Sequence, residues 1–93
     1  MFRIETKNNK NYVIPTSNYI LEHFDKKSFP YDSNWEIFCL FNFPPEDFFK
    51  YIISIYDARV EFKKDFPWVS FYFPSYIKAE QFKKEVEERA QKP

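Results

Sequence analysis

The chain has 93 residues, a formal net charge of zero and an aromatic content of 24%. This length predicts a single domain over residues 1–93. The chain also lacks the excess of basic residues that is typical of a nucleic-acid-binding protein. The sequence contains no glycine, which excludes the phosphate-binding loop, the dinucleotide fingerprint and the nucleophile elbow, because each needs glycine for its backbone geometry. We find neither a signal-peptide pattern nor an apolar run of membrane-spanning length, so we expect a cytoplasmic protein.

Residues 1–34 predict a hairpin, a short helix and a loop. "MFRIET" and "YVIP" flank the turn sequence "KNNKN", in which Asn8 and Asn9 tolerate left-handed backbone geometry. Residues 16–24 predict a short helix with an apolar side. Residues 25–34, "DKKSFPYDSN", predict a loop because proline, aspartate, serine and asparagine are concentrated there.

"WEIFCLFNF", residues 35–43, has the sequence of a β-strand. Strict alternation would place Trp35, Ile37, Cys39, Phe41 and Phe43 on one face and Glu36, Phe38, Leu40 and Asn42 on the other. Both faces are largely apolar, so we expect a central strand. The only cysteine of the chain, Cys39, lies within this run, which favours a buried thiol over a reactive one and excludes an internal disulfide.

Residues 44–58, "PPEDFFKYIISIYDA", predict a helix. The prolines suit its first positions, and Glu46 and Asp47 suit the positive end of the helix dipole. Helical spacing predicts a buried stripe made of Phe48, Phe49, Ile52, Ile53 and Tyr56.

The rest of the chain predicts a second hairpin and a final helix. "RVEFKK" and "WVSFYF" alternate on either side of "DFP", and Ser75 can cap a helix over residues 76–91. That helix would bury Ala79, Phe82, Val86 and Ala90. The predicted order is therefore ββαβαββα, a small α+β domain with an antiparallel-rich sheet and helices packed on one face. Residues 35–93 form a β-α-β-β-α unit that is partly ferredoxin-like in architecture.

The sequence predicts no catalytic, cofactor or metal site, and we expect that the protein is not an enzyme. His23 is the only histidine, so no Cys/His cluster with zinc spacing exists. The acidic pairs have a plain role at a helix start or lie on predicted solvated faces. A catalytic pair of Cys39 and His23 would require both side chains to meet at a concave surface.

The outer face of the predicted sheet is the candidate partner-binding site. Its residues are Phe38, Leu40, Trp68, Ser70, Tyr72, Arg59 and Lys63. An apolar centre with a rim of mixed charge is typical of a protein-binding patch. The alternative is that residues 1–34 fold over this face and make it part of the core.

We therefore expect a non-enzymatic protein-binding module that acts as a stoichiometric inhibitor, an immunity-type protein or an antitoxin-like protein. Inhibitors encoded by phages or mobile elements, anti-CRISPR proteins among them, share this short, cofactor-free profile. A single-stranded nucleic-acid-binding protein that uses the sheet aromatics is the alternative, but a base-stacking platform needs a positive rim, which this stretch lacks. The same aromatic patch could also join two copies in a weak homodimer.

Overall fold

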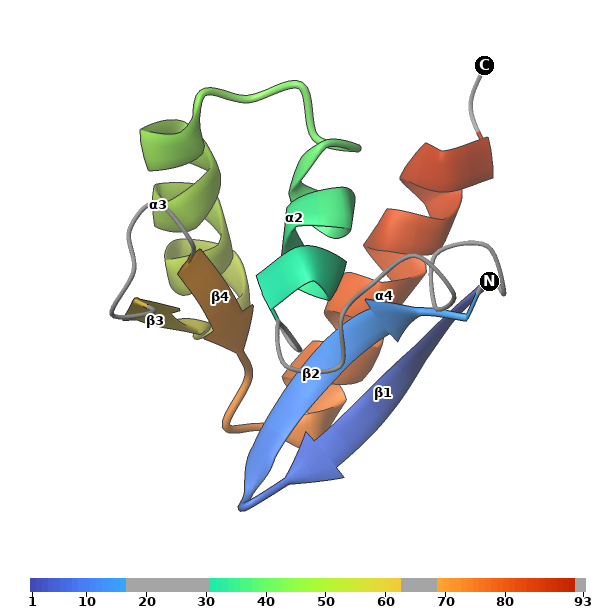
Figure 1. The fold of residues 1–93 in the computed structure, drawn as a ribbon, viewed down its shortest axis with the longest axis vertical. Helices are drawn as coiled ribbons and strands as arrows, with labels where there is room; N and C mark the ends of the chain where they lie inside the picture. The colour runs from blue at the N-terminus through green and yellow to red at the C-terminus, as the bar shows by residue number, and fades with distance from the viewer. Residues whose placement is uncertain (17–30, 63–68, 92–93) are drawn as a thin grey trace.

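The computed structural model describes residues 1–16, 31–62 and 69–91. In chain order, its elements are β1 (Phe2–Lys7), β2 (Lys10–Pro15), α2 (Tyr31–Phe38), α3 (Pro45–Tyr56), β3 (Arg59–Phe62), β4 (Val69–Tyr72) and α4 (Tyr76–Gln91). The three helices lie beside one another, with the β1–β2 hairpin across α4 and the β3–β4 hairpin next to α3 (Figure 1). The α+β class is confirmed, and the order of elements matches the predicted one except around residues 35–43.

The first hairpin is confirmed. Its antiparallel register runs from Phe2 opposite Pro15 to Lys7 opposite Lys10. Asn8 and Asn9 form the turn with φ angles of 53° and 63°. In a chain without glycine, asparagine is the residue that enters this left-handed region most readily, because its short side chain can form local hydrogen bonds.

The predicted strand over residues 35–43 is wrong, because this segment contains the end of a helix and a turn. The buried side chains of Asn34, Ile37 and Phe41 are spaced three and four residues apart, which is the period of a helix. A short run that is apolar at nearly every position cannot distinguish period two from period 3.6. Helix α2 also begins inside the loop predicted for residues 25–34. Residues 17–30, which include the rest of that loop and all but the first residue of the helix predicted for residues 16–24, lie outside the described residues.

This helix also changes the predicted architecture. The strands form two separate two-stranded sheets in the described part of the chain. The first strand of the expected ferredoxin-like unit is therefore replaced by α2, which packs beside β4: Oδ1 of Asn34 accepts a hydrogen bond from the Phe71 N–H at 3.0 Å.

Helix α3 is confirmed, and its prolines and acidic residues occupy its first turn as expected. The predicted buried stripe is too wide. Phe48, Ile52 and Tyr56 are buried, whereas Phe49 is half-buried and Ile53 is 45% exposed. A helix that meets the core along one side buries only a narrow stripe, and Ile53 lies just outside it.

The second hairpin and α4 are confirmed. Strands β3 and β4 pair antiparallel, with Arg59 opposite Tyr72 and Glu61 opposite Ser70. Ser75 caps α4, because its Oγ accepts a hydrogen bond from the Lys78 N–H at 3.3 Å. The predicted stripe of α4 is buried at Ala79, Phe82 and Val86 and only half-buried at Ala90.

Asn11 joins the two hairpins. Its backbone exchanges hydrogen bonds with Phe73, at 3.2 Å from the Asn11 N–H and 2.8 Å to the Asn11 carbonyl oxygen. Its side-chain Nδ2 donates to the carbonyl oxygens of Phe73 at 2.8 Å and Pro74 at 3.3 Å. Its Oδ1 accepts from the Thr6 hydroxyl at 2.7 Å. One buried amide therefore holds β1, β2 and the end of β4 together.

We expect Asn11→Ala to lower the free energy of unfolding by about 1–3 kcal/mol, because it leaves buried carbonyl and hydroxyl groups without their partner. Urea denaturation measures this loss. Asn42→Ala, which truncates an exposed asparagine, is the matched control and should change little. Equal stability of the two variants would show that the Asn11 side chain does not contribute to joining the hairpins.

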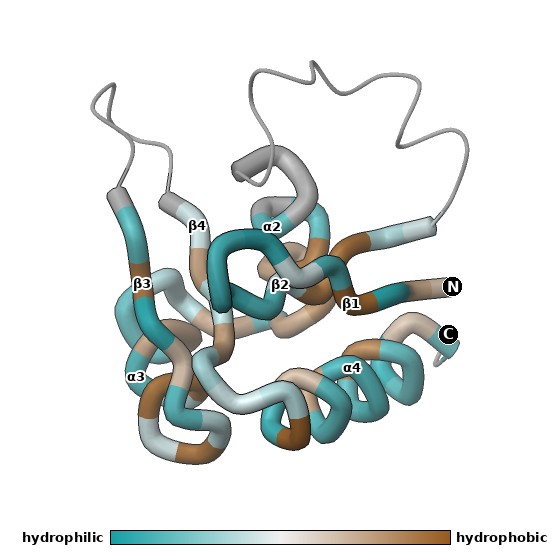
Figure 2. The backbone as a smooth tube through the Cα atoms, turned by 90° about the horizontal axis from the view of Figure 1, so that it is seen from below, coloured by the Kyte–Doolittle hydropathy of each residue, from teal (hydrophilic) through white to brown (hydrophobic). Residues whose placement is uncertain are grey.

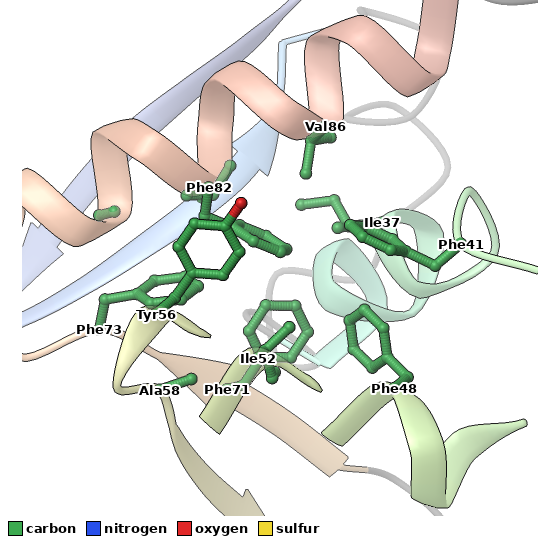
Figure 3. Packing of buried hydrophobic residues seen from close by; sticks show 12 residues of the cluster. Ile37, Phe41, Phe48, Ile52, Tyr56, Ala58, Phe71, Phe73, Phe82 and Val86 are labelled. Atoms are coloured by element: carbon green, nitrogen blue, oxygen red, sulfur yellow. The ribbon is translucent and has the colours of Figure 1, made fainter. Parts of the chain in front are cut away.

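The core is built mainly from aromatic rings (Figure 3). Phe82 of α4 is at its centre: its ring stacks on Phe41 with centroids 5.7 Å apart and planes 2° apart. The same ring contacts Tyr56, Phe71 and Phe73 at centroid distances of 5.3, 5.7 and 4.9 Å. Helices α3 and α4, the turn after α2 and the second hairpin therefore contribute to one aromatic cluster.

Candidate protein-binding surface

The structure separates the residues predicted to form the partner-binding site. Arg59 and Tyr72 lie opposite each other on β3 and β4. Phe38 belongs to α2 and packs edge-on against Phe48, with ring centroids 5.1 Å apart. Leu40 is half-buried in the turn after α2. These two residues do not lie on the outer sheet face, because their segment is not a strand.

Ser70 is fully buried rather than exposed to water, so its expected place on an accessible surface is wrong. Its hydroxyl and the Nδ2 of Asn34 are buried without a hydrogen-bond partner in the described part of the chain. Trp68 and Lys63, the remaining predicted site residues, lie outside the described residues.

A polar and aromatic surface surrounds Tyr72 where the two hairpins meet. We call it the hairpin-junction face, and it consists of Lys10, Arg59, Glu61 and Tyr72 together with Tyr12, which is buried beneath them. The Lys10 ammonium lies 5.0 Å from the centre of the Tyr72 ring and 2.8 Å from Oε2 of Glu61. The Tyr12 hydroxyl donates to Oε1 of Glu61 at 2.9 Å, and the rings of Tyr12 and Tyr72 are 5.9 Å apart. The first hairpin thus covers part of the predicted face.

The charges of this surface are balanced. The side chains of Lys10 and Glu61 are 37% and 31% exposed. Arg59 is 55% exposed and contacts Asp57 at 3.3 Å. Lys10 with Glu61 and Arg59 with Asp57 therefore form two ion pairs near a half-buried tyrosine, and this part of the surface has little net charge.

A second polar cluster lies between α3 and α4. Oε1 of Glu85 accepts hydrogen bonds from the hydroxyl groups of Tyr51, at 2.7 Å, and Tyr56. Oε2 of Glu85 accepts from Nε of Arg89 at 2.8 Å. The Arg89 guanidinium also lies over the ring of Phe41, 4.3 Å from its centre. Both carboxylate oxygens are therefore engaged.

The pKa values in this cluster oppose general acid–base chemistry. Burial raises the pKa of Glu85, but the hydrogen bonds from Tyr56, Tyr51 and Arg89 outweigh it and hold the pKa below the ordinary value of 4.5. Burial and the Glu85 carboxylate raise the pKa values of Tyr56 and Tyr51 above 10.0. The Glu85 carboxylate is thus a weaker base than usual, and the Tyr51 and Tyr56 hydroxyls are weaker acids. General acid–base catalysis works best with pKa values near the working pH, so we interpret these hydrogen bonds as joining α3 to α4.

Cys39 is exposed in the turn after α2, so the expected burial of its thiol is wrong. Partial desolvation and the neighbouring Glu36 carboxylate raise the pKa of this thiol and favour its uncharged, less nucleophilic form. His23, the other half of the conceivable catalytic pair, lies outside the described residues.

Residues 1–16, 31–62 and 69–91 contain no group of three or more histidine, cysteine, aspartate or glutamate residues that could hold a metal ion. None of the helices in these ranges has both the length and the apolar character needed to cross a membrane.

Lys10, Tyr12 and Glu61 are the members of the hairpin-junction face that the predicted site did not include. Alternation in "KNYVIP" places Lys10 and Tyr12 on the same side of β2. Nothing local in the sequence indicates that this side meets Glu61, because the contact spans some fifty positions of the chain: Tyr12 and Glu61 are 49 residues apart. Comparison with known proteins supplies no further assignment, since no family model, curated protein or solved structure matches this chain.

Proposed function

We propose that this chain is a non-enzymatic protein that binds another protein stoichiometrically and inhibits or neutralises it, with the hairpin-junction face as its contact surface. The supporting observation is the half-buried Tyr72, framed by Lys10 and by exposed Arg59. Tyrosine and arginine are enriched where proteins bind one another, and rigid aromatic side chains lose little entropy on binding.

The charge of this face favours a protein over a nucleic acid. A strand-binding platform gains its affinity from lysine and arginine that neutralise phosphates. Here Glu61 already pairs with Lys10, and Asp57 pairs with Arg59. The proposed class therefore includes immunity-type proteins, antitoxins and inhibitors of phage or mobile-element origin, all of which work by occupying a protein surface.

Tyr72→Ala is expected to abolish or strongly weaken capture of the partner. Truncation of an aromatic hot spot typically costs about 2 kcal/mol or more of binding, which is roughly a thirtyfold loss of affinity. The measurement is affinity capture from an extract of the source cells, followed by mass spectrometry. Tyr76→Ala is the matched control, because Tyr76 is 53% exposed on α4 and is not part of the hairpin-junction face.

Thermal melting of both variants separates loss of binding from loss of folding. A folded Tyr72→Ala protein that captures its partner as well as the wild type would show that the hairpin-junction face is not the contact surface. Recovery of nucleic acid in place of a protein, with retention that weakens as salt rises, would instead support the single-strand-binding alternative.

A further inference from the structure

Strand β3 presents a backbone edge that no strand of the described residues pairs with. Its four residues, Arg59–Phe62, form a ladder with β4 on one side only. The strand runs along the outer margin of the molecule (Figure 2). The open edge of a sheet offers unpaired N–H and C=O groups to another chain, so its hydrogen-bonding pattern and its charges decide what can pair with it.

The hydrogen bonds of β4 fix which residues of β3 point outward. The N–H of Phe71 bonds to Asn34, and the N–H and C=O of Phe73 bond to Asn11, so these groups point away from β3. In an antiparallel ladder, alternate residues direct both backbone groups to the same side. The residues of β4 whose backbone N–H and C=O groups point toward β3 are therefore Ser70 and Tyr72. Val60, opposite Phe71, directs its N–H and C=O toward the open edge.

This geometry limits how two copies of β3 could pair about a two-fold axis. Residues that direct their backbone groups outward must lie opposite each other, so the axis passes through a residue and not between two residues. Positions 59, 60 and 61 are three such axes. An axis at Glu61 would place Glu61 opposite its own copy. An axis at Arg59 would place Arg59 opposite its own copy and Asp57 opposite Glu61. Both arrangements oppose like charges.

Of these three axes, only the one through Val60 is complementary. Val60 would exchange both backbone hydrogen bonds with Val60 of the second copy. Arg59 would lie opposite Glu61 of the second copy, and Glu61 opposite its Arg59. Directly opposite side chains of opposite charge stabilise an antiparallel pair, whereas like charges destabilise it.

From these observations we infer that a second copy of this chain pairs with the open edge of β3. The two strands run antiparallel about a two-fold axis through Val60. The dimer joins the β3–β4 hairpins of both copies into one four-stranded sheet. This contact uses the backbone edge of β3 and differs from a dimer formed through the exposed aromatic patch.

Sedimentation velocity over a dilution series from micromolar to millimolar concentration tests this dimer. The wild type is expected to shift from monomer to dimer. Arg59→Glu places two acidic residues opposite each other and is expected to remain monomeric throughout the series. Arg59→Glu combined with Glu61→Arg exchanges the charges and is expected to restore the dimer. Lys50→Glu reverses an exposed charge on α3 and should behave as the wild type.

Amide hydrogen exchange tests the register. Dimer formation should slow exchange at Val60 as the concentration rises, with little change at Glu61, whose N–H already faces β4. Thermal melting verifies that each variant is folded, because Glu61→Arg also removes contacts to Lys10 and Tyr12. If the doubly substituted protein does not fold, the inference is tested by comparing dimer formation in Arg59→Glu and in the wild type.

Three results would overturn the inference. They are a wild type that stays monomeric at millimolar concentration, an Arg59→Glu variant that dimerises like the wild type, and a Val60 amide whose exchange does not depend on concentration. None of them bears on the capture of a different protein by Tyr72, so this inference and the proposed function can fail separately.

Discussion

Phe82→Ala is expected to lower the free energy of unfolding by about 3–5 kcal/mol, the usual cost of replacing a buried phenylalanine by alanine. Phe82 is fully buried, stacks on Phe41 and contacts rings from α3 and the second hairpin. Its removal would leave a cavity where all of these elements meet. Domains of this size are stable by about 5–15 kcal/mol, so the loss is a large part of the total.

Urea denaturation of Phe82→Ala and Ile53→Ala compares the free energy of unfolding lost by truncating a core residue and an exposed residue. Ile53 is 45% exposed on α3, so its truncation should cost roughly 0.5 kcal/mol or less. If Phe82→Ala does not fold, Phe82→Leu keeps most of the side-chain volume and should show a smaller but measurable loss. Equal losses in Phe82 and Ile53 variants would contradict the position of the aromatic core.

Glu85→Gln is expected to lower the free energy of unfolding at neutral pH by about 1–3 kcal/mol. The substitution keeps the shape of the side chain but removes the charge that accepts hydrogen bonds from Tyr51, Tyr56 and Arg89. Only 18% of the Glu85 side chain is exposed, so water replaces these partners poorly.

The stability difference between the wild type and Glu85→Gln should depend on pH. Because the folded-state pKa of Glu85 lies below its ordinary value of 4.5, its contribution is complete above that value and is lost as the pH falls through the folded-state pKa. Unfolding experiments from pH 7 down to acidic pH should therefore show the two proteins converging. Glu88→Gln, an exposed glutamate on the same helix, is the control. A difference that stays constant with pH would contradict the role of the Glu85 charge.

The sequence predicted an element correctly where a short local pattern is compatible with only one backbone structure. The paired asparagines predicted the first turn because no other residue type in that segment tolerates left-handed geometry as well. The two prolines and acidic residues before "FFKYIISIY" predicted α3, and Ser75 predicted the start of α4. These features act over three or four residues and need no tertiary information.

The errors have a common physical origin. In "WEIFCLFNF" nearly every position is apolar, so the sequence does not show which period is used, and the packing of Ile37 and Phe41 against the core decides in favour of a helix. The same tertiary contacts place Cys39 at the surface. Phe38 and Leu40 belonged to the predicted binding face only if residues 35–43 form a strand. Ser70 is buried, and Arg59 and Tyr72 remain opposite each other.

Site-specific photo-crosslinking tests the proposed binding surface most directly. A photoreactive phenylalanine analogue at Arg59 reports on the hairpin-junction face, and the same analogue at exposed Lys84 reports on the far side of α4. After irradiation in source cells, the account predicts a covalent adduct with a different protein at position 59 and none at position 84. An adduct at position 84 alone, an adduct with nucleic acid, or a self-adduct as the only product at position 59 would contradict it.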